Sequence, residues 1–203
     1  MSGSVDTTRL DALARATQRA GVWNVPTEIL LENLASDEAP EAMAERPEFR
    51  YLPARFLEQS IQRKRAILDH YPRSEDRRRF IEVRRRTILA LHRAGAGLLL
   101  GSDSPQWWNV PGFSVLGELE ALVAGGLTPY EALATGTRNV AAFLGVADRA
   151  GTIAVGKQAD LLLLEANPLE DIANVWRRSG VMVRGQWLSG AEVERRLAAL
   201  VLR

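Results

Sequence analysis

Apolar residues in the first part of the chain recur at intervals of three or four positions, a spacing typical of amphipathic helices. One such helix is expected over 8–20, where Gly21 ends the pattern. A short strand is expected over 22–26, followed by a helix over 28–34. Residues 36–53 contain Pro residues at three positions and predict a long, partly ordered insertion.

Two arginine-rich helices are expected next, separated by Pro72. Their sequences are SIQRKRAILDH and SEDRRRFIEVRRRTILALHRAG. In the second helix, Ser74 is a candidate N-cap and Gly95 a candidate end. Its apolar residues recur at near-helical spacing: Phe80, Ile81, Val83, Ile88, Leu89 and Leu91.

The pattern changes after Gly95. Residues 96–100 form an apolar run, which favours a strand buried on both faces, as in a parallel sheet. The run ends in the sequence GSDSP, and the loop after it leads into a helix expected over 113–124. Two shorter helices are expected over 128–135 and 137–144.

Beyond position 150 the apolar period becomes two, which indicates strands. Strands are expected over 151–155 and 161–164, with a turn between them. A hairpin is expected over 181–188, with its turn at Arg184-Gly185. The order of elements therefore predicts an α/β chain whose last part is a small antiparallel sheet.

Two helix starts show the spacing of a capping box. In this motif the side chain of the N-cap residue accepts a hydrogen bond from the backbone N–H three residues later, and the side chain of that later residue accepts one from the N-cap backbone N–H. Thr128 with Glu131 marks the first box, with a proline between them at the first helical position. Ser189 with Glu192 marks the second and predicts a last helix over 191–200.

Composition narrows the class of protein. The chain is 46% hydrophobic and 25% charged with a formal net charge of +1, as expected for a globular protein of one or two domains. No run of 18 apolar residues occurs, so no membrane span is expected. The start MSGSVDTTRL lacks the pattern of a signal peptide, and the cytoplasm is the expected compartment. The absence of cysteine excludes disulfides and thiolate metal sites.

Asp103 is the first candidate for chemistry, because it follows a buried strand in a glycine-flanked loop. The carboxyl ends of parallel strands are where ligands bind in α/β folds. A carboxylate there can bind a metal, accept a proton from water or hold a substrate amine. It can equally cap a turn, and the spacing alone leaves both interpretations open.

Three aromatic residues lie close to Asp103 in the sequence, and such groups can line a substrate pocket. A place in the core is the favoured interpretation for Trp108 and Phe113. For Trp107 both interpretations stay open.

The two histidines, His70 and His92, are expected near the C-terminal ends of helices, where the helix dipole favours them. Neither belongs to a metal-binding motif, so both are expected to be structural. The arginine-rich stretch 63–86 offers a different function, binding of nucleic acid through a basic face. Interleaved acidic residues and the nearly neutral chain favour a solvated helix face instead.

Three sequence motifs in combination resemble the C-terminal part of the amidohydrolase superfamily, closest to its imidazolonepropionase-like and prolidase-like members. They are GSD, then ELEALVAGGLTPYEALATGTRNVAAFLG, then GTIAVGKQADLLLL. The match covers 95–188, and 19–27 resembles the seventh barrel strand and its approach.

The resemblance implies a metal-dependent hydrolase on a (β/α)8 TIM barrel, with GSD at the end of the eighth strand. It assigns Asp103 as a metal ligand and as the group that carries a proton from the attacking water to the leaving amine. Ser104, Trp107 and Gly112 are then expected to shape the substrate end of the site. The substrate class is a small-molecule amide, such as a dipeptide or an N-acyl amino acid, and the cofactor a divalent metal, with zinc expected.

The other ligands of the family pattern, an H-x-H pair, a lysine or glutamate and two further histidines, have no counterpart here. The chain therefore resembles only the last two strands and helices of the barrel, over 1–150 with a helical insertion at about 36–94. Residues 151–190 resemble part of a small composite β-domain, a partial sandwich, and 191–203 a C-terminal helix.

Two strands cannot close an eight-stranded barrel. We therefore expect that this chain alone binds no catalytic metal and hydrolyses nothing. A gene fragment is the favoured explanation. A decayed remnant and a split hydrolase, whose N-terminal half is a separate chain, are the others. Association of several copies of this chain into a homo-oligomer is a further possibility. Binding to nucleic acid or to a membrane is not expected.

Overall fold

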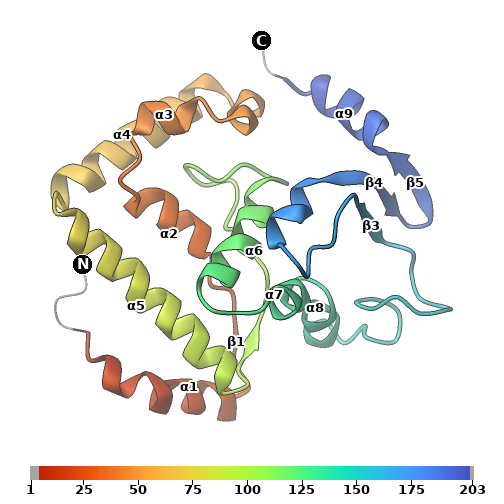
Figure 1. Cartoon of the computed structure of the whole chain (residues 1–203), viewed down its shortest axis with the longest axis horizontal. Helices are drawn as coiled ribbons and strands as arrows, with labels where there is room; N and C mark the ends of the chain where they lie inside the picture. The colour runs from red at the N-terminus through yellow and green to blue at the C-terminus, as the bar shows by residue number, and fades with distance from the viewer. Residues whose placement is uncertain (1–4, 202–203) are drawn as a thin grey trace.

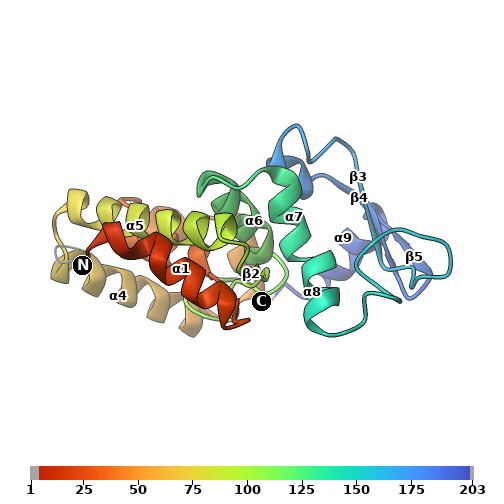
Figure 2. The same cartoon turned by 90° about the horizontal axis from the view of Figure 1, so that it is seen from below.

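The computed structural model describes residues 5–201. The first part consists mainly of helices, with two very short strands among them. A three-stranded sheet with a last helix lies at the other end of the molecule (Figures 1 and 2). The elements are η1 (Thr7–Arg9), α1 (Leu10–Arg19), β1 (Trp23–Asn24), α2 (Glu28–Ala35), α3 (Pro40–Ala44), η2 (Pro47–Tyr51), α4 (Ala54–His70), α5 (Ser74–Arg93), β2 (Gly97–Leu98), α6 (Ser114–Ala124), α7 (Pro129–Thr135), α8 (Arg138–Phe143), β3 (Leu161–Leu164), η3 (Ile172–Trp176), β4 (Arg178–Val183), β5 (Gln186–Ser189) and α9 (Gly190–Ala198).

Strands β1 and β2 pair in parallel, which is the arrangement expected of neighbouring barrel strands. Both are shorter than the predicted 22–26 and 96–100. The ladder continues only to the bond from the Leu99 N–H to the Asn24 carbonyl, at 2.9 Å. The next N–H, of Leu100, donates instead to the carbonyl of Thr135 at the end of α7, at 3.1 Å. Because a strand is defined by its pairing, these bonds set its length.

The segment between β1 and β2 is helical, as expected, but the prediction of a partly ordered stretch over 36–53 was wrong. This stretch forms α3 and η2, and each contributes a buried side chain, Met43 and Phe49. The prolines begin helical turns here instead of marking irregular chain, because proline is well tolerated in the first helical turn.

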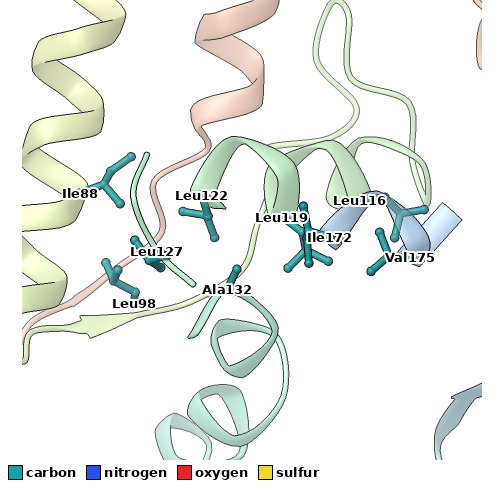
Figure 3. Packing of buried hydrophobic residues seen from close by; sticks show 9 residues of the cluster. All are labelled: Ile88, Leu98, Leu116, Leu119, Leu122, Leu127, Ala132, Ile172 and Val175. Carbon is teal, nitrogen blue, oxygen red and sulfur yellow. The ribbon is translucent and has the colours of Figure 1, made fainter. Parts of the chain in front are cut away.

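The apolar side chains form two cores. The first joins α5, β2, α6, the start of α7 and η3 (Figure 3), through Ile88, Leu98, Leu116, Leu119, Leu122, Leu127, Ala132, Ile172 and Val175. The second lies under the insertion and the loop after β2, through Leu30, Leu34, Met43, Phe49, Trp108 and Val110. Helix α1 packs along α5 (Figure 2).

The capping predictions had different outcomes. The box of Thr128 and Glu131 is confirmed, with both bonds present. At Ser189 only the first bond forms, because the Glu192 carboxylate accepts from Arg195 and Arg196 instead. Ser74 was expected as an N-cap but is the first residue of α5, displaced by one position.

Strands β3, β4 and β5 form an antiparallel sheet in that order, and the predicted hairpin is confirmed. Its turn residues Arg184 and Gly185 both have positive φ, 49° and 78°, as a tight turn between twisted strands requires. The predicted strand over 151–155 was wrong, since no strand is assigned there and Ile153 and Val155 are exposed. Among the described residues, no helix combines the length and the apolar character that a membrane crossing needs.

Candidate active site

Asp103 lies in the loop that follows β2, at the carboxyl end of the parallel strand pair, as the sequence predicts. The residue is exposed and adopts the left-handed region, with φ of 55°. Its Oδ2 accepts a hydrogen bond from Nε2 of Gln106 at 2.7 Å. A non-glycine residue with positive φ is uncommon and costs energy, and such positions concentrate at functional sites.

Asn109 fixes the shape of this loop, and sequence reasoning missed it. Its side chain is fully buried, and its Nδ2 donates to the carbonyl of Ser102, the residue before Asp103. Its backbone N–H donates to the carbonyl of Gln106 at 2.7 Å. The side chain and the backbone N–H of Asn109 together therefore hold the loop on both sides of Asp103.

The loop is tied through Asn109 to α2. The Asn109 Oδ1 accepts a bond from Nδ2 of Asn33 at 3.4 Å. The carbonyl of Asn33 in turn accepts from Nζ of Lys64 at 2.6 Å, and this lysine also bonds Ser36. Lys64 is fully buried, and burial lowers the pKa of its amine to about 8. A polar chain thus links the Asp103 loop to α2 and α4.

The three residues predicted to line a substrate lie in the same loop. Ser104 is half-buried, and its Oγ lies 3.5 Å from the carbonyl oxygen of Asn109. The ring of Trp107 is covered by the guanidinium of Arg63, 4.9 Å from the ring centroid. Gly112 is exposed, with φ of 81°, just before α6 begins. Trp107 is thereby held against α4.

The two remaining aromatic residues belong to the second core, as favoured from the sequence. Trp108 is 2% exposed and packs edge-to-face on Phe49, with ring centroids 5.5 Å apart. Phe113 is half-buried and stacks on Tyr51. The indole N–H of Trp108 has no acceptor among the described residues. The rings of Trp108 and Phe113 therefore anchor the loop after β2 in the second core.

The histidines lie at helix ends, as predicted. His70 is the last residue of α4 and packs edge-to-face on Tyr71. His92 lies in the last turn of α5, with its Nε2 2.9 Å from Oε1 of Glu131. Within residues 5–201, no three His, Cys, Asp or Glu side chains come together as metal ligands.

A divalent metal of the kind that the family resemblance implies needs three or more protein ligands when it is zinc. Asp103 supplies one exposed carboxylate. The residues described here therefore do not fit a complete metal centre.

The arginine-rich stretch is largely neutralised by carboxylates. Arginines of α4 and α5 form ion pairs with acidic residues of α2, α3, the connection between α2 and α3, and α5 itself: Arg65–Glu41, Arg77–Asp37, Arg78–Asp37, Arg84–Glu28, Arg85–Glu32 and Arg86–Glu82. This pairing disfavours the alternative of a basic face that binds nucleic acid, because phosphate recognition requires available cations.

Two buried glutamates, Glu28 and Glu118, were also missed by sequence reasoning. Both are 0% exposed, and each has one oxygen, Oε1, without a hydrogen-bond donor among the described residues. The Glu118 Oε2 accepts the N–H of Ile29 at 2.7 Å, at the start of α2. Burial raises the pKa of Glu118 to about 7 and raises that of Glu28, although Arg84 opposes the shift at Glu28.

A signal for Glu118 was present in the sequence. It lies four residues before Leu122 and therefore on the same face of α6. Leu122 is 0% exposed, so this face of the helix points into the first core.

Comparison with known proteins identifies the family of the chain. The model of the amidohydrolase family matches residues 9–188, which is most of the chain. The chain therefore belongs to the amidohydrolase family.

The chain is also similar to individual proteins. Ochratoxinase from Aspergillus niger is 39% identical over 82 residues, which are 39% of this chain and 16% of the relative. Imidazolonepropionase from Maricaulis maris is 34% identical over 114 residues, or 52% and 27% of the two chains. A crystal structure of a Xaa-Pro dipeptidase with bound methionine in its active site shares the fold, with a TM-score of 0.60 at 20% identity. The likeness covers 92% of this chain and 38% of the dipeptidase, so this chain spans well under half of each relative.

Proposed function

We propose that this chain is the C-terminal portion of a metal-dependent amidohydrolase that cleaves the C–N bond of a small-molecule amide, such as a dipeptide or an N-acyl amino acid. The observation that carries the proposal is Asp103, held with positive φ at the carboxyl end of a parallel strand in a chain of this family. The name of one similar structure, a Xaa-Pro dipeptidase, supports a dipeptide as the substrate class.

Asp103 is the proposed acid–base group. Its carboxylate would accept a proton from water as the water oxygen forms a bond to the amide carbon. As the C–N bond breaks, the carboxyl group would return this proton to the leaving nitrogen. Gln106 holds Oδ2, and Oδ1 has no donor among the described residues, which supports a role for the second oxygen in the transfer.

Ser104, Trp107 and Gly112 are the proposed substrate-side residues. The ring of Trp107 offers an apolar surface next to the carboxylate, and Arg63 fixes its orientation. Gly112 carries no side chain in an exposed stretch before α6, which leaves room for a bound group.

The proposed metal is zinc, with Asp103 as one ligand and the histidine ligands contributed by the rest of the amidohydrolase fold. The rest of the fold would be either a separate chain or a longer form of this one. The β1–β2 pair supports this arrangement, because among residues 5–201 neither strand has a partner on its outer edge. The proposed location of the protein is the cytoplasm.

Reconstitution tests this function. The 203-residue chain is expected to bind no stoichiometric zinc and to hydrolyse no dipeptide or N-acyl amino acid. Coexpression with the six-stranded N-terminal portion, taken from the preceding DNA or a neighbouring frame that encodes H-x-H, is expected to restore both zinc binding and hydrolysis.

Asp103→Asn should then lower the hydrolysis rate by about 10²–10⁴-fold, the range for loss of an acid–base group. Asp148→Asn is the matched control, since Asp148 is exposed and lies outside the loop. Tight stoichiometric zinc in the chain alone, or full activity of the Asp103 variant, would contradict the proposal.

A further inference from the structure

A cavity of about 570 Å³ lies between α2, α5 and α6, away from the loop that carries Asp103. Apolar side chains from all three helices line it, among them Ala35, Ile81, Leu89 and Ala124. Gly125 extends the wall beyond the end of α6 without adding a side chain. The volume lies within the range of small-molecule binding sites.

The backbone groups at the end of α2 beside this cavity are already bonded. The Ala35 carbonyl accepts from Nε of Arg77 at 3.2 Å, and the Ser36 carbonyl accepts from Nζ of Lys64 at 3.1 Å. These two carbonyls therefore already have donors and need none from a ligand. An apolar group placed against them would leave both carbonyls paired.

Arginines and carboxylates alternate around the rim of the cavity. Two carboxylates each pair with one arginine: Glu32 lies 2.7 Å from Arg85, and Glu82 pairs with Arg86. These two pairs are electrically balanced.

The third carboxylate, Asp37, pairs with two arginines, Arg77 and Arg78. Arg77 is buried, and its Nε and Nη1 donate to the backbone carbonyls of Ala35 and Tyr71. The rim therefore carries one surplus positive charge at its Asp37 end.

Arg78 is the arginine of this pair that can meet a ligand. Its side chain is 68% exposed, and one of its terminal nitrogens bonds Asp37 and Ser74. Its Nε and its other terminal nitrogen have no partner among the described residues. Two adjacent guanidinium donors match the two oxygens of a carboxylate.

We propose that this cavity binds a small organic carboxylate, with its apolar chain or ring on the surface formed by Ala35, Leu89 and Ala124 and its carboxylate at Arg78. In this proposal the arginine-rich stretch 63–86 binds a small molecule and not a nucleic acid. It is separate from the proposed hydrolytic site and does not depend on it.

Titration calorimetry of the full chain tests this site with three probes. 4-Phenylbutyrate has both features, 4-phenylbutan-1-ol has the apolar part alone, and acetate has the charge alone. We expect saturable binding of 4-phenylbutyrate, and binding at least tenfold weaker for each of the other two. Equal affinity for the alcohol and the carboxylate would overturn the proposal.

Variants place the ligand in the cavity. Arg78→Gln should weaken 4-phenylbutyrate binding about tenfold, the loss expected for a charge-assisted hydrogen bond. Arg79→Gln is the matched control, because Arg79 is exposed on the same helix and does not line the cavity. An equal loss in both variants would show non-specific attraction and contradict the proposal.

Filling the cavity gives an independent test. Ala124 is exposed, so Ala124→Phe adds a ring from the solvent side and leaves the cores intact. We expect this variant to lose 4-phenylbutyrate binding, while Ala142→Phe, at an exposed position of α8, retains it. Thermal unfolding confirms that both variants are folded, and undiminished binding by a folded Ala124→Phe protein overturns the site.

Discussion

Residues 5–150 and residues 151–201 bury their apolar side chains to very different extents. The first region contains both cores. From the second region, Ile172 and Val175 join the first core through η3, and Leu164 of β3 packs against it. In β3, by contrast, Leu162 and Leu163 are 46% and 54% exposed, although neighbouring residues of a strand point to opposite faces. Trp187 in β5 is 48% exposed. Neither face of the small sheet is therefore fully covered.

The difference in burial follows from which elements cover the apolar side chains of each region. Helices α2, α5 and α6 enclose apolar side chains between them, so the first region is covered by its own elements. The sheet β3–β5 has α9 against it, and a sheet with uncovered apolar faces needs a further layer. The chain spans 38% of the structurally similar dipeptidase, which is consistent with a layer supplied from elsewhere in that fold.

Leucine truncation in the two regions gives the largest expected contrast. Leu122→Ala, at a position 0% exposed, should lower the free energy of unfolding by about 3–5 kcal/mol through lost burial and a cavity. Leu162→Ala should cost about 1 kcal/mol or less, because the leucine is already half in water. Urea unfolding at pH 7 measures both, and equal losses would show that the two regions do not differ in packing.

Removing the charge of Glu118 is the next largest effect. The folded-state pKa of about 7 lies above the ordinary value of 4.5, so folding favours the protonated acid. This stabilising effect is fully present below pH 4.5 and is lost as pH rises through 7, with a change of about 3 kcal/mol. Glu118→Gln keeps an acceptor for Ile29 and should flatten the decline of stability between pH 5 and 8 in urea unfolding.

Glu131 provides a control because folding shifts its pKa in the opposite direction, downward. Bonds from Thr128 and His92 lower its pKa to about 2, so it stabilises the fold above pH 4.5 and loses this effect as pH falls toward 2. Glu131→Gln should therefore alter only the acid side of the stability profile. A Glu118→Gln profile that still declines from pH 5 to 8 like that of the wild type would assign the decline to other groups.

Truncation of Asn109 should have a moderate effect within the well-packed region. Asn109→Ala removes the donor to Ser102 and the partner of Asn33, and we expect a loss of about 1–3 kcal/mol. Amide hydrogen exchange should accelerate most in the loop 101–112. Exchange that increases evenly over the chain would mean that Asn109 supports the core rather than the loop.

The smallest expected change lies in the open region. Val155 is 106% exposed, so Val155→Ser should change stability by less than about 0.5 kcal/mol. It should lower any self-association driven by exposed apolar side chains, as measured by analytical ultracentrifugation. A stability loss above 1 kcal/mol would mean that this segment packs against other elements.

Local features were predictable from the sequence. The box at Thr128 and the turn at Arg184-Gly185 depend on residues that are neighbours in the chain, and both are confirmed. The length of β1 was not predictable, because it depends on pairing with a strand more than 70 positions away.

Asp103 could be nominated from the sequence, and the long-range contacts of Asn109 and Glu118 could not. The bond between Asn109 and Asn33 joins positions 76 apart, and that between Glu118 and Ile29 joins positions 89 apart. An asparagine or a glutamate in a helical or loop sequence carries no mark of such a distant partner. Tertiary packing alone places these side chains.

The bonds of Lys64 to the end of α2 have a practical consequence for chemical labelling. The chain contains two lysines, and Lys64 is fully buried, whereas Lys157 is half-buried in the turn before β3. An amine-selective reagent applied to the folded protein should therefore modify Lys157 before Lys64. A dye or a surface tether attached through Lys157 would lie beside the open sheet, and later reaction at Lys64 would time the opening of α2 away from α4.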